Sequence, residues 1–159
     1  NTKSKSLNDI SIAPDGKVFV SDSGGNCIFV IGSETLDLFL ESDQLDRMNG
    51  IMASEDLLFL GSKGNFISVS RKTKEIRVLF ENAGYLDGIV QVADQKFVTS
   101  DWKGKVQLIE IGKGADILMD GTAASMYAAD LDYISSQKLL LVPTFSNNRV
   151  VAYKLNIGK

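Results

Sequence analysis

A pattern about forty residues long occurs four times in this chain of 159 residues. Each copy contains an apolar run, a polar turn, a second apolar run, another turn and a third run. The copies are anchored at Asn8, Asn49, Asp87 and Ala129, at steps of 41, 38 and 42 residues. A period near forty with three or four short strands in each repeat is typical of a β-propeller.

The residues within each copy favour strands over helices. Residues 17–21 are rich in β-branched and aromatic side chains, and turn-forming clusters stand at Pro14-Asp15-Gly16 and Gly24-Gly25-Asn26. We therefore predict an all-β chain of about fifteen strands in four sheets, or blades. The predicted blades span approximately residues 7–43, 48–81, 86–120 and 128–156, and the last lacks its outer strand.

The number of blades raises a physical problem. Propellers have roughly 4 to 8 blades, and an open arc of blades exposes an apolar face at each end. We therefore expect one partial propeller domain over residues 1–159, whose ends are covered by missing blades or by self-association. A complete four-bladed ring remains the alternative.

Composition excludes several classes of function. The net charge is −3 and no basic run occurs, which argues against a nucleic-acid partner. The longest apolar stretch, 139–143, is far shorter than the roughly 20 residues of a membrane span. With no histidine and a single cysteine, Cys27, the chain has no Cys–His or Ser–His pair and no internal disulfide. We expect a soluble chain, and a periplasmic or secreted location stays open.

The openings of the copies resemble one protein family. LNDISIAPDGKVFVSD, MNGIMASEDLLFLGS and LDGIVQVADQKFVTSDWKGKVQLIEI are similar to successive blades of the NHL-related gluconolactonase, regucalcin and senescence-marker-protein family of six-bladed propellers. AADLDYISSQKLLLVPTFSNNRVVAY is similar to the blade that follows. The likeness covers about four of the six blades. It departs at Met48 and Leu86, where the family usually has proline, and at Ile10, where it has glycine.

The resemblance implies a divalent cation at the ring centre, with Asn49 and Asp87 among its ligands and Asn8 in contact with substrate. It also implies a metal-binding glutamate on an earlier blade, which we expect to lie outside this sequence. Equivalent positions of the innermost strands surround the propeller axis, and their oxygen donors suit Ca²⁺ first, with Mg²⁺, Mn²⁺ or Zn²⁺ as alternatives. The competing interpretation is that Asn and Asp at these strand entrances only stabilise turns.

Two further sets of residues are candidates for the site. Asp101 is a candidate general base in a lactonase-type mechanism, although the recurring Ser-Asp pairs at 21–22 and 100–101 are also typical of hydrogen bonds that stabilise a blade. Trp102 and Tyr127 are candidates for stacking on a sugar-like small molecule, although a lone tryptophan after a strand often covers a blade edge. Cys27 and Met48 are expected to pack in the interior.

Two functions remain open after the sequence alone. The first is a metal-dependent hydrolase of a lactone or related small ester, as the resemblance implies. The second is a non-catalytic NHL-like scaffold that binds a ligand or a protein, since one fold serves many functions.

Overall fold

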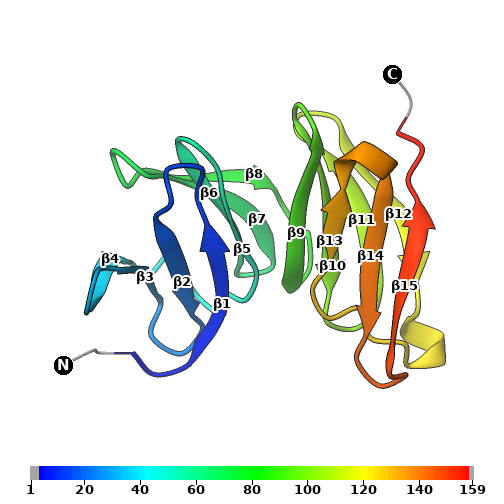
Figure 1. Cartoon of the computed structure of the whole chain (residues 1–159), viewed down its shortest axis with the longest axis horizontal. Helices are drawn as coiled ribbons and strands as arrows, with labels where there is room; N and C mark the ends of the chain where they lie inside the picture. The colour runs from blue at the N-terminus through cyan, green and yellow to red at the C-terminus, as the bar shows by residue number, and fades with distance from the viewer. Residues whose placement is uncertain (1–3, 158–159) are drawn as a thin grey trace. The chain divides into compact units, whose positions relative to one another are not determined.

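The computed structural model describes residues 4–157, and in this part of the chain all regular structure is β-strand apart from two 3-10 turns. Fifteen strands form four antiparallel sheets, each built from strands in sequence order (Figure 1). The first blade contains β1 (Leu7–Ile12), β2 (Val18–Asp22), β3 (Cys27–Ile31) and β4 (Leu36–Glu41). The second contains β5 (Ile51–Ala53), β6 (Leu57–Ser62), β7 (Asn65–Ser70) and β8 (Ile76–Phe80).

The third blade has four strands and the fourth has three. The third contains β9 (Leu86–Ala93), β10 (Lys96–Asp101), β11 (Lys105–Glu110) and β12 (Gly114–Asp120). The fourth contains β13 (Asp132–Ile134), β14 (Leu139–Thr144) and β15 (Arg149–Lys154). The 3-10 turns are η1 (Thr122–Ala124) and η2 (Ser135–Gln137). Within residues 4–157 the predicted strand number is confirmed, and the last blade has no outer strand.

The chain divides into two compact units, Asn1–Leu86 and Asp87–Lys159. The first unit holds the first two blades, and the second holds the last two. In each unit, apolar side chains from both blades form one buried cluster, which contains Ile28 and Leu58 in the first unit and Val106 and Leu140 in the second. Met48 is fully buried in the first cluster, as predicted.

The strand registers show that the copies are structural repeats. In the first three blades the pairing between the third and fourth strands shifts at the same place, at 28/29, 66/67 and 106/107. A shift of this kind inserts an extra residue and increases the local twist. The shared registers allow each residue to be matched with its equivalents in the other blades.

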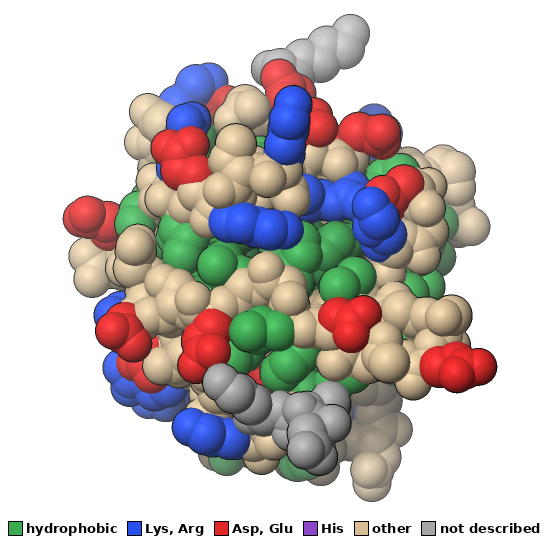
Figure 2. All heavy atoms as spheres, turned by 90° about the vertical axis from the view of Figure 1, so that its left-hand side faces the viewer, with side chains coloured by type: hydrophobic (Ala, Val, Ile, Leu, Met, Phe, Trp, Pro, Cys, Tyr) green, Lys and Arg blue, Asp and Glu red, His purple; other side chains and the backbone are tan. Residues whose placement is uncertain are grey.

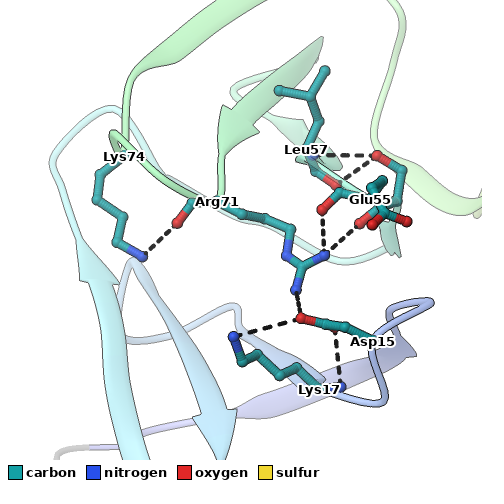
Figure 3. Close-up of polar contacts among 7 residues, drawn as sticks. Asp15, Lys17, Glu55, Leu57, Arg71 and Lys74 are labelled. Atoms are coloured by element: carbon teal, nitrogen blue, oxygen red, sulfur yellow. Dashed lines mark hydrogen bonds and ion pairs between the residues drawn. The ribbon is translucent and has the colours of Figure 1, made fainter.

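Arg71 joins the two blades of the first unit. Its guanidinium lies 2.6 Å from the carboxylate of Asp15 (Figure 3) and donates a hydrogen bond of 2.8 Å to the carbonyl of Ser54. It also lies over the ring of Phe19. Burial opposes ionisation of Asp15, but the nearby Arg71 and Lys17 outweigh it and lower the pKa of this carboxyl. Arg71 thus ties the turn after β1 to the turn after β7.

Two blade faces leave apolar residues exposed at positions that are buried elsewhere. Ile10 is 58% exposed, whereas its equivalents Ile51 and Leu131 are 5% and 7% exposed. Val150 is 63% exposed, whereas its equivalents Ile28 and Val106 are 0% and 1% exposed. On the side of the molecule shown in Figure 2, hydrophobic side chains are likewise visible among charged ones. These faces of the first and fourth blades therefore have the chemistry of a blade interior.

Candidate functional site

Asn8 and Asn49 belong to one hydrogen-bond network in the first unit. Asn8 lies exposed on β1 and donates its side-chain amide to the hydroxyl of Ser23 at 2.9 Å. Ser23 in turn donates to the carbonyl of Met48, and the hydroxyl of Ser21 donates to the carbonyl of Asn49 at 2.7 Å. The two predicted residues are thus linked through serines and backbone carbonyls, and their joint role in a site stays a prediction.

Asn49 has a buried side-chain oxygen that lies outside this network. Its side-chain oxygen is buried and accepts no hydrogen bond in the described part of the chain. A buried acceptor without a partner costs about 1–3 kcal/mol. Such an oxygen fits a cation that prefers oxygen ligands, or a donor group of a ligand.

Asp87 opens the second unit, on the half-buried start of β9. The following Gly88 has a steric role, because a Cβ atom there would lie 2.5 Å from the backbone nitrogen of Leu131. Its N–H donates to the hydroxyl of Ser100 at 2.8 Å. Because Asn49 and Asp87 belong to different units, their joint binding of a cation stays a prediction. Ala129 is half-buried and adds no polar group.

The two Ser-Asp pairs differ in their second member. Ser21 and Ser100 both accept a hydrogen bond from the first strand of their own blade, from the N–H groups of Asp9 and Gly88. The prediction that these serines stabilise a blade is confirmed. Asp101 is half-buried, and its carboxylate accepts the N–H of Lys103 at 2.7 Å within its own turn.

Asp22 is buried and holds the residues that lead into its blade, its entry segment. Its carboxylate accepts the N–H groups of Lys5 and Ser6, each at 2.8 Å, and those of Gly24 and Gly25. Burial raises the pKa of this carboxyl, but the four backbone donors outweigh it and lower the pKa overall.

Ser62 stands at the equivalent position of the second blade. It holds that blade's entry segment, because its hydroxyl accepts the N–H of Asp46 at 3.0 Å and donates to the carbonyl of Gln44. This position therefore has a structural role in both blades of the first unit.

Three aromatic rings meet in the second unit. Trp102, which follows β10, lies 4.8 Å from the ring of Phe145 and 5.6 Å from that of Tyr127. Trp102 is 40% and Phe145 is 65% exposed. Trp102 and Tyr127, the two candidates for stacking on a ligand, therefore lie together, and ligand binding by them stays a prediction. Sequence reasoning missed Phe145, although it follows the second strand of its blade as Trp102 follows β10.

The described residues contain no group of three or more His, Cys, Asp or Glu side chains that could hold a metal ion. The side-chain oxygens of Asn8 and Asn49 belong to amides, which lie outside that set of residue types.

Cys27 is buried, and its thiol contacts the carbonyl of Gly25 at 2.9 Å, in agreement with the predicted packing role. Among residues 4–157, no helix is long and apolar enough to cross a membrane.

Neither a family model nor a curated protein matches the sequence, but solved structures match the fold. A chain of a nidogen/laminin complex has a TM-score of 0.76 at 15% identity over 93% of this chain, and a streptogramin B lyase has 0.71 at 14% over 98%. A computationally designed protein, Ika4, has 0.68 at 13% over 98%. This chain spans 94% of Ika4 but only 60% and 56% of the other two chains.

The structures that resemble this chain are β-propellers, and the chain has that fold. Identities of 13–15% establish architecture and leave activity open. The similar chains include an enzyme and a member of a protein complex.

Proposed function

We propose that the chain is a ligand-binding β-propeller module, with the aromatic cluster of Trp102, Tyr127 and Phe145 as its binding surface. The ligand is a small molecule with a flat or sugar-like face. The observation that carries this proposal is the exposure of Trp102 and Phe145 side by side.

Large apolar rings are normally withdrawn from water, because burial stabilises a Phe or Trp side chain by about 1.5–3 kcal/mol or more. Two adjoining rings in solvent therefore offer stacking area at little cost in side-chain entropy. Asp101 precedes Trp102 in the chain and supplies a carboxylate that can accept a ligand hydroxyl. Apolar surface with a few polar groups is the usual composition of a small-molecule site.

Trp102 is the single tryptophan, so its fluorescence reports directly on this surface. Titration with methyl glycosides and with gluconolactone is expected to give a saturable change in emission. Phe145→Ala should weaken that binding at least fivefold, because it removes one stacking surface. Tyr85→Ala, which alters an exposed aromatic residue of the first unit, is the control and should have no effect. Unsaturable signals with every probe, or equal losses in both variants, would contradict the proposal.

A second candidate function is a divalent-metal-dependent hydrolase of a lactone, and the unpartnered oxygen of Asn49 favours it. Asn49 and Asp87 would hold the cation, with Asn8 near the substrate and Asp101 as the base. The cation would polarise the ester carbonyl.

Calorimetric titration with Ca²⁺ tests this second candidate. Asp87→Asn should lower the affinity at least tenfold, because it removes a formal charge while keeping the shape, whereas Asn49→Asp should retain binding. Equal affinities of the wild-type chain and Asp87→Asn would exclude it. Gluconolactone hydrolysis, followed by acid release with and without a chelator, tests the activity separately.

A further inference from the structure

A pocket of about 310 Å³ lies in the second unit between β12 and β15. Its apolar walls come from the strands of both blades and from the residue that follows β15: Val106, Leu118, Met119, Leu140, Val142, Tyr153 and Leu155. β15 pairs with β14 on one side, and in the described part of the chain no strand pairs with its other side. The pocket therefore adjoins an open sheet edge.

The first unit contains the same arrangement with a fourth strand in place. The registers match Val106 with Ile28, because each pairs with the Ser of a Ser-Asp pair, and match Tyr153 with Val69. By the same registers, the six wall residues that lie within strands correspond in order to Ile28, Phe39, Leu40, Leu58, Leu60 and Val69.

All six of these equivalents belong to the apolar cluster of the first unit or pack against it. Ile76 of β8 packs against that cluster as well, and it pairs directly with Val69. The second unit has no counterpart of Ile76 among its described residues. The pocket is therefore the space that an apolar side chain of a fourth strand fills in the first unit.

We propose that β15 binds an extended peptide segment of a partner protein. The segment adds to the sheet as an antiparallel fourth strand and places an apolar side chain opposite Tyr153, in the pocket. Main-chain hydrogen bonds give such an added strand its affinity, and the pocket for an alternate side chain gives it specificity.

The chain's own fourth strands indicate the chemistry of the partner segment. The residue at the position of Ile76 is followed five positions later by an acidic residue, within the strand or just after it, in all three: Leu36 and Glu41, Ile76 and Glu81, Ala115 and Asp120. Asp120 pairs with Lys105, and the equivalent of Lys105 on β15 is the exposed Arg149. The partner segment should therefore carry an apolar residue followed five positions later by Asp or Glu.

The first test uses a peptide with the sequence of residues 74–82, KEIRVLFEN, which contains the strand that fills this space in the first unit. A fluorescently labelled peptide should bind the full chain saturably in an anisotropy titration. Ile76→Asp in the peptide should weaken binding at least tenfold, and Glu81→Lys should weaken it severalfold by placing a cation opposite Arg149. Absence of saturable binding, or equal binding of the Ile76→Asp peptide, would overturn the proposal.

The second test uses neighbouring residues of β12 in the protein. Leu118 lines the pocket and is 42% exposed, whereas Ile117 is 56% exposed and lies outside the pocket. Leu118→Asp should abolish peptide binding and Ile117→Asp should preserve it. Equal effects would overturn the proposal. Should Leu118→Asp fail to fold, amide shifts in the wild-type NMR spectrum decide: shifts confined to β15 and the pocket support the proposal, and shifts elsewhere contradict it.

Discussion

Asp22 shows how a single carboxylate can secure the start of a blade. Asp22→Asn replaces one acceptor oxygen with a donor that faces a backbone N–H group, and hydrogen bonds to a charged group are lost with it. We expect a loss of about 3 kcal/mol in the free energy of unfolding at pH 7. Urea denaturation checks this value, with the exposed Asp43→Asn as the control. A loss no larger than that of the control would contradict the role of Asp22.

The lowered pKa of Asp22 predicts a pH dependence with a definite sign. The folded state binds the Asp22 proton less readily than the unfolded state, so its stabilising contribution is present above the ordinary carboxyl pKa of about 3.9. That contribution is lost as the pH falls through the lower, folded-state pKa. The difference in stability between the wild type and Asp22→Asn should therefore shrink as denaturation curves are measured from pH 5 towards pH 2. A constant difference would contradict the linkage.

Gly88 tests the steric interpretation of the Asp-Gly opening. An alanine Cβ there meets the backbone of residues 130 and 131, which cannot yield as a flexible side chain can. Gly88→Ala should cost about 3 kcal/mol, at the upper end of overpacking effects. Gly112→Ala, whose Cβ would meet nothing within 4 Å but whose φ is +78°, should cost only about 1 kcal/mol. Thermal denaturation of both variants checks that Gly88→Ala loses more stability than Gly112→Ala. Equal losses of stability would contradict the steric interpretation.

Sequence alone identified some of these residues and not others, for physical reasons. Aromatic residue type singled out Trp102 and Tyr127, and repeat alignment placed Ser21 and Ser100 at one structural position. It did not reveal that Asp22 binds Lys5 and Ser6, because that contact depends on the path of the entry segment in space. The unpartnered oxygen of Asn49 was equally invisible, since hydrogen-bond satisfaction is a property of three-dimensional surroundings.

At the scale of strands and turns, Arg71 is the clearest connection between two blades. Arg71→Met should destabilise the first unit by about 2 kcal/mol, because it removes charged hydrogen bonds to Asp15 and to the carbonyl of Ser54. Asp15→Asn should cost less, since Asp15 is 40% exposed and the backbone acceptors of Arg71 remain. A double-mutant cycle should show coupling between the two positions. Additive losses would contradict the contact.

Strand positions were more predictable than their assembly. The period near forty, the alternation within each run and the turn clusters located the strands of the four blades to within a few residues. The matching shifts at 28/29, 66/67 and 106/107 could not be predicted, because the extra residues Phe39, Leu79 and Leu118 are ordinary apolar strand residues with no glycine to mark them. The two-unit organisation also has no linker signal in the sequence.

At the scale of the whole molecule, the two exposed blade faces predict self-association. Ile10 and Val150 occupy positions that are buried in other blades, so a second copy can cover them through contacts of the kind that already join blades. Analytical ultracentrifugation of the 159-residue chain should show mass rising with concentration. The double variant Ile10→Lys, Val150→Lys should remain a monomer with little loss of stability. Val78→Lys, at an exposed apolar residue of β8, is the control.

A wild-type chain that stays monomeric at millimolar concentration, with one cooperative unfolding transition, would contradict this expectation. If Val78→Lys prevented self-association as effectively as the double variant, the assignment of self-association to the two blade faces would be contradicted.

The hold that Asp22 and Ser62 exert on their own entry segments has a consequence for how such a chain can arise. Each of the first two blades carries within its own forty residues the group that fixes where it begins. A gene segment that encodes one blade can therefore be duplicated or deleted as a cassette without separating a start from the residue that secures it. Later divergence then needs only to keep a hydrogen-bond acceptor at that position of the blade. A carboxylate, as in Asp22, and a hydroxyl, as in Ser62, both meet this requirement.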